Sequence, residues 1–260
     1  MYLIETEDNV GFLTASYVKN RIKSFVSTNN KPYFVLALPT GGTAIDFYKH
    51  LVKFCQKGLS FDKVVTFNLD EYVGLPENHP ESYHSFMAKN LFDHIKIQKE
   101  QINILNGNAA DLNAECKNYE EKIKNYGGID LLIGGIGQNG HIAFNEPGSA
   151  FDSKTHIVNL TPSTIAANAR FFNGDISLVP TQALTMGLGT IMNAKEVIIM
   201  ATGPKKAQAL YHAFEDKQST AWPVTVLQKH PRTFIIADKA ATVEISKTTK
   251  QNCGLCSFVN

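Results

Sequence analysis

The stretch Tyr33-Phe-Val-Leu-Ala-Leu-Pro-Thr-Gly-Gly-Thr43 decides the fold. Its first six residues are apolar and predict a strand that is buried on both faces, and its two glycines predict a tight turn. Residues 44–56 follow with their apolar side chains on one helical face. A buried strand, a glycine turn and an amphipathic helix in this order are typical of a parallel sheet that is covered by helices.

The same alternation continues along the chain. It predicts an α/β fold class: a single doubly wound, Rossmann-like domain over residues 1–260, with a mostly parallel sheet flanked by helices. Further strands are expected at 64–68, 129–133, 196–201 and 233–237, and further helices at 111–126 and 205–215.

Two parts of the chain lack this pattern. Residues 147–180 have weak periodicity and several helix breakers, so we expect an insertion or a lid over a site. Near the end, Cys253 and Cys256 form a C-x-x-C pair, but no second pair of ligands stands at zinc-site spacing. The pair is interpreted as two thiols in a loose tail.

Composition limits the classes of function. Apolar residues make up 43% of the 260 residues and charged residues 19%, which is typical of a globular protein. The net charge is only +1, and this argues against a nucleic-acid partner. The acidic N-terminus does not resemble a secretory signal, and no apolar run is long enough to span a bilayer. We therefore expect a cytoplasmic protein without a membrane partner.

The turn at 40–43 is a candidate phosphate site. Glycines allow a ligand to approach the backbone closely, and a helix N-terminus attracts anions. An ordinary strand-to-helix turn with a threonine cap explains the same residues equally well. Two cations, one after a strand and one in the predicted lid, favour the phosphate site. The candidates are Thr40, Gly41, Gly42, Thr43, Arg170 and Lys206.

The segment 135–140 matches the pattern G-x-G-x-x-G after a strand, but it is not expected to bind a dinucleotide. That fingerprint requires a helix opening within it and an acid about 20 residues later. Pro147 cuts the helix short, and position 160 is a leucine. The glycines are more consistent with a tight loop that directs polar side chains inward.

Polar side chains follow two of the predicted strands. Asn139, His141 and Glu146 follow one, and Asp70 and Glu71 follow another. Adjacent residues in an extended segment point in opposite directions, so the two acids are not expected to share a role. A histidine and separate carboxylates beside an anion site suit proton transfer on a phosphorylated small molecule. The spacing of the histidines does not indicate a metal site.

Long motifs in this chain resemble those of the glucosamine-6-phosphate deaminase family. The resemblance covers residues 1 to about 247, and the tail 247–260 diverges. It is carried by Leu38–Thr43, Phe67-Asn-Leu-Asp-Glu-Tyr-Val-Gly-Leu75, His79–Tyr83, Gly137-Gln-Asn-Gly-His-Ile-Ala-Phe-Asn-Glu-Pro147 and Ala167–Phe172.

The resemblance implies a reaction: glucosamine 6-phosphate plus water gives fructose 6-phosphate plus ammonia, by isomerisation and deamination without a cofactor. This would make the chain an isomerase and hydrolase acting on an amino-sugar phosphate, and a homo-oligomer is expected. By motif position, Asp70 would take the C2 proton and His141 would assist ring opening. Glu146 and Asn139 would orient that histidine. Gly41, Gly42, Thr43, Arg170 and Lys206 would hold the phosphate.

Two departures from the family pattern predict differences in behaviour. Many members have Asp where this chain has Asn139, and Asn carries no charge, so we expect activity with an altered pH profile. Members that are activated by N-acetylglucosamine 6-phosphate use a Ser, an Arg and a Lys, which here read Ser149, His156 and Val158. The loss of two cations predicts hyperbolic, unactivated kinetics and an assembly smaller than the hexamer.

Two other functions remain open at this stage. A 6-phosphogluconolactonase-type hydrolase would share the phosphate turn and the loop histidine, but it would release an acid from a lactone. A non-catalytic sugar-phosphate sensor would bind without turnover. It would need a DNA-binding module, and the sequence has neither a helix-turn-helix pattern nor a basic extension.

Overall fold

The structure of the chain is a computed structural model that describes residues 1–7, 9–28 and 31–253. Its centre is a sheet of seven strands in the order β1-β10-β9-β6-β2-β3-β5. All six neighbouring pairs in this sheet are parallel. The strands are β1 (Tyr2–Thr6), β2 (Phe34–Leu38), β3 (Val64–Asn68), β5 (Ile102–Asn103), β6 (Leu131–Gly135), β9 (Val197–Ala201) and β10 (Thr233–Asp238).

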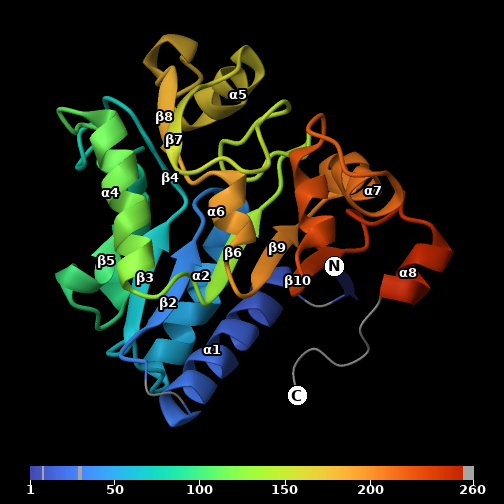
Figure 1. Ribbon diagram of the computed structural model, residues 1–260, viewed down its shortest axis with the longest axis horizontal. Helices are drawn as coiled ribbons and strands as arrows, with labels where there is room; N and C mark the ends of the chain where they lie inside the picture. Colours follow the sequence, from blue (N-terminus) through green and yellow to red (C-terminus); the bar gives the residue numbers. More distant parts are fainter. Residues whose placement is uncertain (8, 29–30, 254–260) are drawn as a thin grey trace.

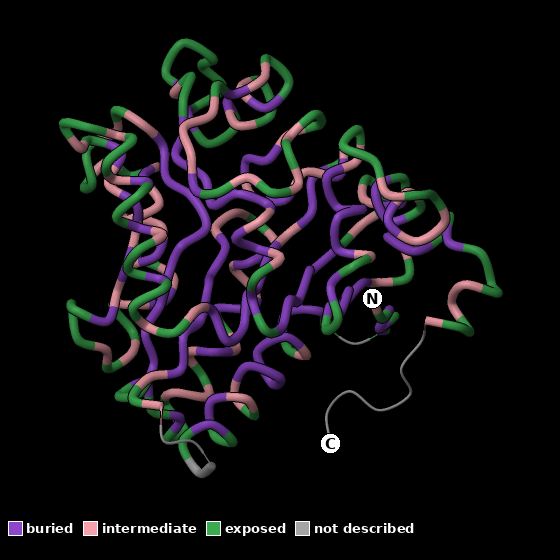
Figure 2. The backbone as a smooth tube through the Cα atoms, viewed as in Figure 1, coloured by how far each residue is buried: buried purple, intermediate pink, exposed green. Residues whose placement is uncertain are grey.

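Side chains alternate between two apolar cores on the two faces of the sheet. In β2, for example, Val35 and Ala37 belong to one core, and Phe34, Leu36 and Leu38 belong to the other. Helices α1 (Val10–Thr28), α2 (Gly42–Gln56) and α3 (Tyr83–Asn90) contribute to the second core. Helices α4 (Leu112–Asn125), α6 (Leu188–Met192) and α7 (Ala207–Glu215) contribute to the first. Figure 2 shows the central strands buried between these layers.

A small antiparallel sheet lies at the carboxyl-end side of the main sheet, at the top of Figure 1. Its order is β4-β8-β7, from Asp70–Tyr72, Gln182–Thr185 and His156–Asn159. Helix α5 (Pro162–Asn168) and short 3-10 turns complete the segment that was expected to be an insertion or a lid. They share a core of their own, made of Tyr72, Phe144, Leu160, Ala169, Phe172, Val179 and Ala183.

The predicted α/β fold with a mostly parallel sheet is confirmed, and the five predicted strands lie within two residues of their expected ends. The predicted helix at 205–215 is a 3-10 turn, Pro204–Lys206, followed by α7. Asp111 caps α4 as expected, because its carboxylate accepts a hydrogen bond from the Ala114 amide at 2.9 Å. Helix α8 (Lys247–Cys253) lies in the tail, and Cys256 lies outside the described residues.

No helix in the described ranges is long and apolar enough to cross a membrane. The loop after β6 also agrees with the sequence: residues 136–155, all of them described, contain no helix. The glycine pattern therefore does not open a dinucleotide-binding helix there.

Candidate active site

A hollow of about 430 Å³ lies beyond the carboxyl ends of the central strands, which is the usual place for ligands in open α/β sheets. Nine of the ten predicted site residues line it. The tenth, Glu146, bonds to Asn139 at its wall. The nine are Thr40, Gly41, Gly42, Thr43, Asp70, Asn139, His141, Arg170 and Lys206.

The turn between β2 and α2 can hold an anion. Gly41 is the N-cap of α2 with φ of 94°, a conformation that favours glycine. No side chain caps this helix end, so the threonine-cap explanation of the turn does not hold. The first turn of α2 therefore offers free N–H groups and the positive end of the helix dipole to the hollow.

Two cations from distant parts of the chain lie on this hollow. Lys206 precedes α7, and Arg170 belongs to the 3-10 turn after α5 (Ala169–Phe171). Burial, together with the charges of Arg170 and Lys205, lowers the pKa of Lys206. The site thus concentrates positive charge, and a bound dianion would relieve the repulsion.

Asp70 is a buried carboxyl group on the wall of the hollow. It is 7% exposed, and its Oδ1 has no hydrogen-bond partner among the described residues. Burial, followed by the charge of the adjacent Glu71, raises the pKa of Asp70 to about 8. A carboxyl group with a pKa near the operating pH can both remove and return a proton.

Glu71 points away from the hollow, as the alternation along β4 predicts. Its carboxylate accepts hydrogen bonds from the backbone amides of Tyr72, Tyr83 and His84 at 2.8, 3.0 and 3.1 Å, and it lies 2.8 Å from His84 Nδ1. Glu71 therefore holds the start of α3 against β4. The two adjacent carboxylates therefore lie in separate surroundings.

The loop after β6 fixes the backbone of His141. The Gly137 amide donates to the His141 carbonyl oxygen at 2.9 Å, and the Val224 amide donates to the Gly140 carbonyl oxygen at 2.9 Å. A Cβ atom at position 137 would lie only 2.2 Å from the His141 ring. Any side chain at position 137 would therefore displace the His141 ring, which packs directly on the loop backbone.

Glu146 links Asn139 and His141. Its Oε2 accepts a hydrogen bond from Asn139 Nδ2 at 2.7 Å and lies 3.7 Å from His141 Nδ1. Burial by itself raises the pKa of Glu146, but His141, Thr164 and Asn139 lower it to about 2. The carboxylate is therefore ionised at neutral pH and can accept a hydrogen bond from the histidine.

Several residues of the hollow were not predicted from the sequence. Tyr83 and Asn168 lie within the motifs that carry the family resemblance, but no role was assigned to them. Thr164 lies in the weakly patterned segment, where only the Thr-Pro start of a short helix gives a signal. The lining residues without a predicted role include Tyr83, Phe144, Ser163, Thr164, Asn168 and Phe171.

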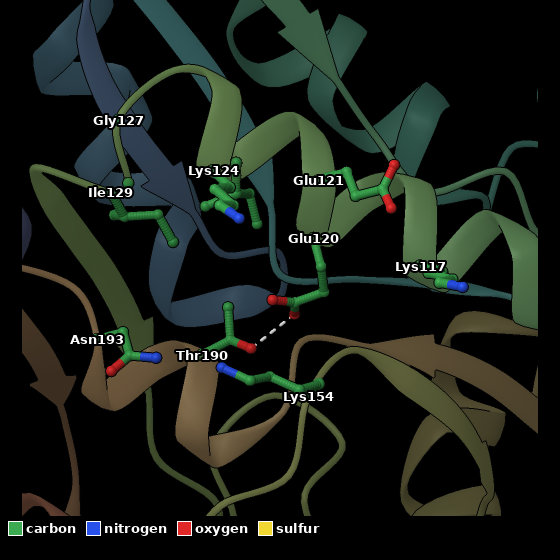
Figure 3. Close-up of a pocket in the computed structure, with 11 residues that line it drawn as sticks. Lys117, Glu120, Glu121, Lys124, Gly127, Ile129, Lys154, Thr190 and Asn193 are labelled. Atoms are coloured by element: carbon green, nitrogen blue, oxygen red, sulfur yellow. Dashed lines mark hydrogen bonds between the residues drawn. The ribbon is translucent and has the colours of Figure 1, made fainter.

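A second hollow, of about 470 Å³, lies between α4 and the chain near Lys154 and Thr190 (Figure 3). Its central carboxylate, Glu120, already accepts hydrogen bonds from the Thr155 amide, the Thr155 hydroxyl and the Thr190 hydroxyl at 2.9, 2.6 and 2.6 Å. Glu120 therefore ties α4 to the facing segments. None of the ten predicted site residues lines this hollow.

The chain is similar to known proteins over most of its length. Residues 5–235 match the family described as glucosamine-6-phosphate isomerases/6-phosphogluconolactonase, and the chain belongs to this family. Within it, a glucosamine-6-phosphate deaminase of Erwinia tasmaniensis is 53% identical over 245 residues, covering 94% of this chain and 92% of that protein. A glucosamine-6-phosphate deaminase of Aeromonas hydrophila is 52% identical over 247 residues, covering 95% of this chain and 92% of that protein.

Two solved structures are similar to this chain. A structure described as a monomeric glucosamine-6-phosphate deaminase has a TM-score of 0.85 at 39% identity and covers 94% of this chain and all of its own. A 6-phosphogluconolactonase from Thermotoga maritima has a TM-score of 0.71 at 18% identity and covers 92% of this chain and 98% of its own. It shows the shared fold alone. The names of the relatives are those of isomerases and deaminases, and they do not support the hydrolase class that was also expected.

The contact between Asn139 and Glu146 leads to a prediction about pH. Asn139→Asp replaces the donor that Glu146 accepts with a second negative charge. Two neighbouring carboxylates would repel one another and favour bound protons in this cluster, so the pH dependence of kcat should move upward by about one pH unit. Steady-state assays across pH would measure this, with Asn118→Asp on the exposed side of α4 as the control. An unchanged profile in Asn139→Asp would contradict the assigned role.

Proposed function

We propose that the chain converts glucosamine 6-phosphate and water into fructose 6-phosphate and ammonia. The observation that carries this proposal is the shared placement of an anion site, a buried carboxyl group and a histidine–carboxylate pair on one hollow. The identity of more than 50% to deaminases along nearly the whole chain supports the substrate.

The reaction begins at the phosphate. The N-terminus of α2, Lys206 and Arg170 hold the phosphate, and this binding energy orients the sugar against Asp70. His141 moves a proton to or from the ring oxygen, with Glu146 and Asn139 as its support. Ring opening comes first because only the open aldehyde makes the C2 proton acidic.

Asp70 then takes the proton from C2, and the electron pair forms an enol-type intermediate between C1 and C2. Return of a proton to C1 leaves a C2 imine. Water adds to that carbon, the C–N bond breaks, and ammonia leaves a ketone at C2. No oxidant, reductant or further group is needed to balance these steps. We also propose that residues 1–260 form one domain and that residues 147–180 act as a lid over the hollow. The reaction is proposed to take place in the cytoplasm.

Products distinguish this function from its closest alternative. The purified chain should release ammonia from glucosamine 6-phosphate and should not accelerate the release of acid from 6-phosphogluconolactone. The reverse pattern would assign the chain to the lactonase branch. Tight binding of the amino sugar without any product would favour the sensor.

Kinetics should be hyperbolic and insensitive to N-acetylglucosamine 6-phosphate. Ser149 donates its hydroxyl to the Glu146 carbonyl oxygen at 2.7 Å, and His156 Nδ1 lies 2.7 Å from the Lys154 carbonyl oxygen. Val158 carries no charge, so this region lacks two of the expected phosphate contacts. Initial rates over a range of substrate concentrations, with and without the acetylated sugar, test this. Sigmoidal rates that the acetylated sugar relieves would contradict it.

The state of assembly stays a prediction. The chain is expected to form either a monomer or a homo-oligomer smaller than six subunits, and one similar solved structure is described as monomeric. Light scattering during size exclusion would measure the mass directly against the 28.7 kDa of one chain.

A further inference from the structure

The Glu146 carboxylate joins two separate parts of the chain. Its Oε2 faces the loop after β6, where it bonds Asn139 and lies 3.7 Å from His141 Nδ1. Its Oε1 faces α5, where it accepts hydrogen bonds from the hydroxyl groups of Thr164 and Thr161, the latter at 3.5 Å. The orientation of this carboxylate therefore depends on α5 as well as on its own loop.

Thr164 is held firmly enough to act as the anchor. The residue is 9% exposed, and its amide donates to the N-cap hydroxyl of Thr161 at 3.2 Å. The chain on both sides of α5 is buried in the small apolar core through Leu160 and Ala169. The Thr164 hydroxyl thus has a fixed position, and its bond is made to an ionised acceptor, which strengthens it.

His141 depends on this arrangement. Its Nδ1 is buried and has no hydrogen-bond partner among the described residues, and the Glu146 carboxylate lies 3.7 Å away. A small rotation of the carboxylate therefore decides whether the two groups meet. Of the two hydroxyl groups that bond the far oxygen of Glu146, that of Thr164 makes the shorter hydrogen bond.

We propose that Thr164 is a positioning residue of the proton shuttle: it holds Glu146 so that Glu146 orients His141 for ring opening. This inference rests on the proposed function. The 3-10 turn that follows α5 carries Arg170, one of the phosphate cations, so the test must separate loss of the proton shuttle from loss of phosphate binding.

The test compares Thr164→Val, which keeps the shape and removes the hydroxyl, with Thr164→Ser, which keeps the hydroxyl. Thr164→Ala is the second variant without a hydroxyl, in case valine disturbs the packing. Thr181→Val, an exposed threonine after the same segment, is the matched control. Each protein is assayed for kcat and KM with glucosamine 6-phosphate, for its inhibition constant with glucitol 6-phosphate, and for its melting temperature.

Glucitol 6-phosphate has the phosphate but no ring to open. Its inhibition constant therefore measures the affinity of the hollow for the phosphate and chain, without the proton transfer of ring opening. Loss of one hydrogen bond to a charged group should lower kcat about 10-fold in Thr164→Val and Thr164→Ala. KM and the inhibition constant should stay within about twofold, since the lost hydrogen bond orients the proton shuttle and does not contact the phosphate. Thr164→Ser should recover most of kcat, and Thr181→Val should match the wild-type chain.

Three results would overturn the inference while leaving the proposed function intact: a wild-type kcat in Thr164→Val, a parallel loss of kcat and glucitol 6-phosphate binding, or no recovery in Thr164→Ser. A wild-type chain that releases no ammonia would overturn both.

Discussion

An Asp70→Asn enzyme should lose about 10³-fold in kcat while KM for glucosamine 6-phosphate changes little. The amide has nearly the shape of the carboxyl group, so the hollow and the phosphate site remain. It cannot take a proton from C2, and Asp70 is the only carboxyl group among the described residues that line the hollow. Steady-state kinetics of the two proteins measure the effect. A variant that keeps one tenth of the wild-type kcat would remove Asp70 from the mechanism.

The same substitution should stabilise the fold. Because burial and Glu71 raise the pKa of Asp70 to about 8, the folded chain binds this proton more tightly than the unfolded chain does. The resulting stability is present below about pH 4 and is lost as the pH rises toward 8. Asp70→Asn removes that loss, so its free energy of unfolding should exceed that of the wild type by roughly 2–4 kcal/mol at pH 8.

Denaturant unfolding at several pH values would measure this difference. The gap between the two proteins should be small near pH 4 and should widen as the pH rises to 8. A gap that is independent of pH would mean that the titration of Asp70 does not contribute to it. Because activity falls while stability rises, simple misfolding of the variant cannot imitate the expected pair of results.

A Lys206→Met enzyme should raise KM by about 10²-fold, because a half-buried cation facing a phosphate dianion makes strong charge-assisted hydrogen bonds. Methionine keeps much of the length of the side chain and removes the charge. Lys205→Met is the matched control, since Lys205 is exposed and does not line the hollow. The control should change KM only slightly.

Inorganic phosphate gives a second measurement of the same site without catalysis. It should raise the melting temperature of the wild type and of Lys205→Met, because a ligand that binds only the folded chain stabilises it. The melting temperature of Lys206→Met should rise much less when phosphate is added. Equal stabilisation of all three proteins would mean that the phosphate binds elsewhere.

The central fold could be predicted because its strands are short, apolar on both faces and followed by glycine turns. β2 shows this best: all five residues are buried, and the turn after it contains two glycines. Helix α1 was missed because polar residues on its inward side, Thr14 and Ser16, weaken the apolar period. The buried Thr14 hydroxyl has a hydrogen-bond partner within the helix, because it donates to the Val10 carbonyl oxygen at 2.8 Å.

The site could be predicted as a set of residues but not as an arrangement. The glycine turn, two cations and the polar side chains that follow two strands supplied the ten candidates, and the family resemblance gave nine of them a role. The ends of the parallel strands explain why they meet. The burial of Asp70 and the bond from Thr164 to Glu146 depend on how the small sheet and α5 pack over the main sheet. No periodic pattern in the sequence of residues 147–180 predicts how the segment packs over the main sheet.

Side-by-side release of ammonia and fructose 6-phosphate tests the proposed function most directly. The purified chain is mixed with glucosamine 6-phosphate, and both products are followed in the same sample, with Asp70→Asn as the control. We expect the two products in equal amounts from the wild type and almost none from the variant. Fructose 6-phosphate without ammonia, unequal amounts, or equal rates from both proteins would contradict the reaction or the role of Asp70.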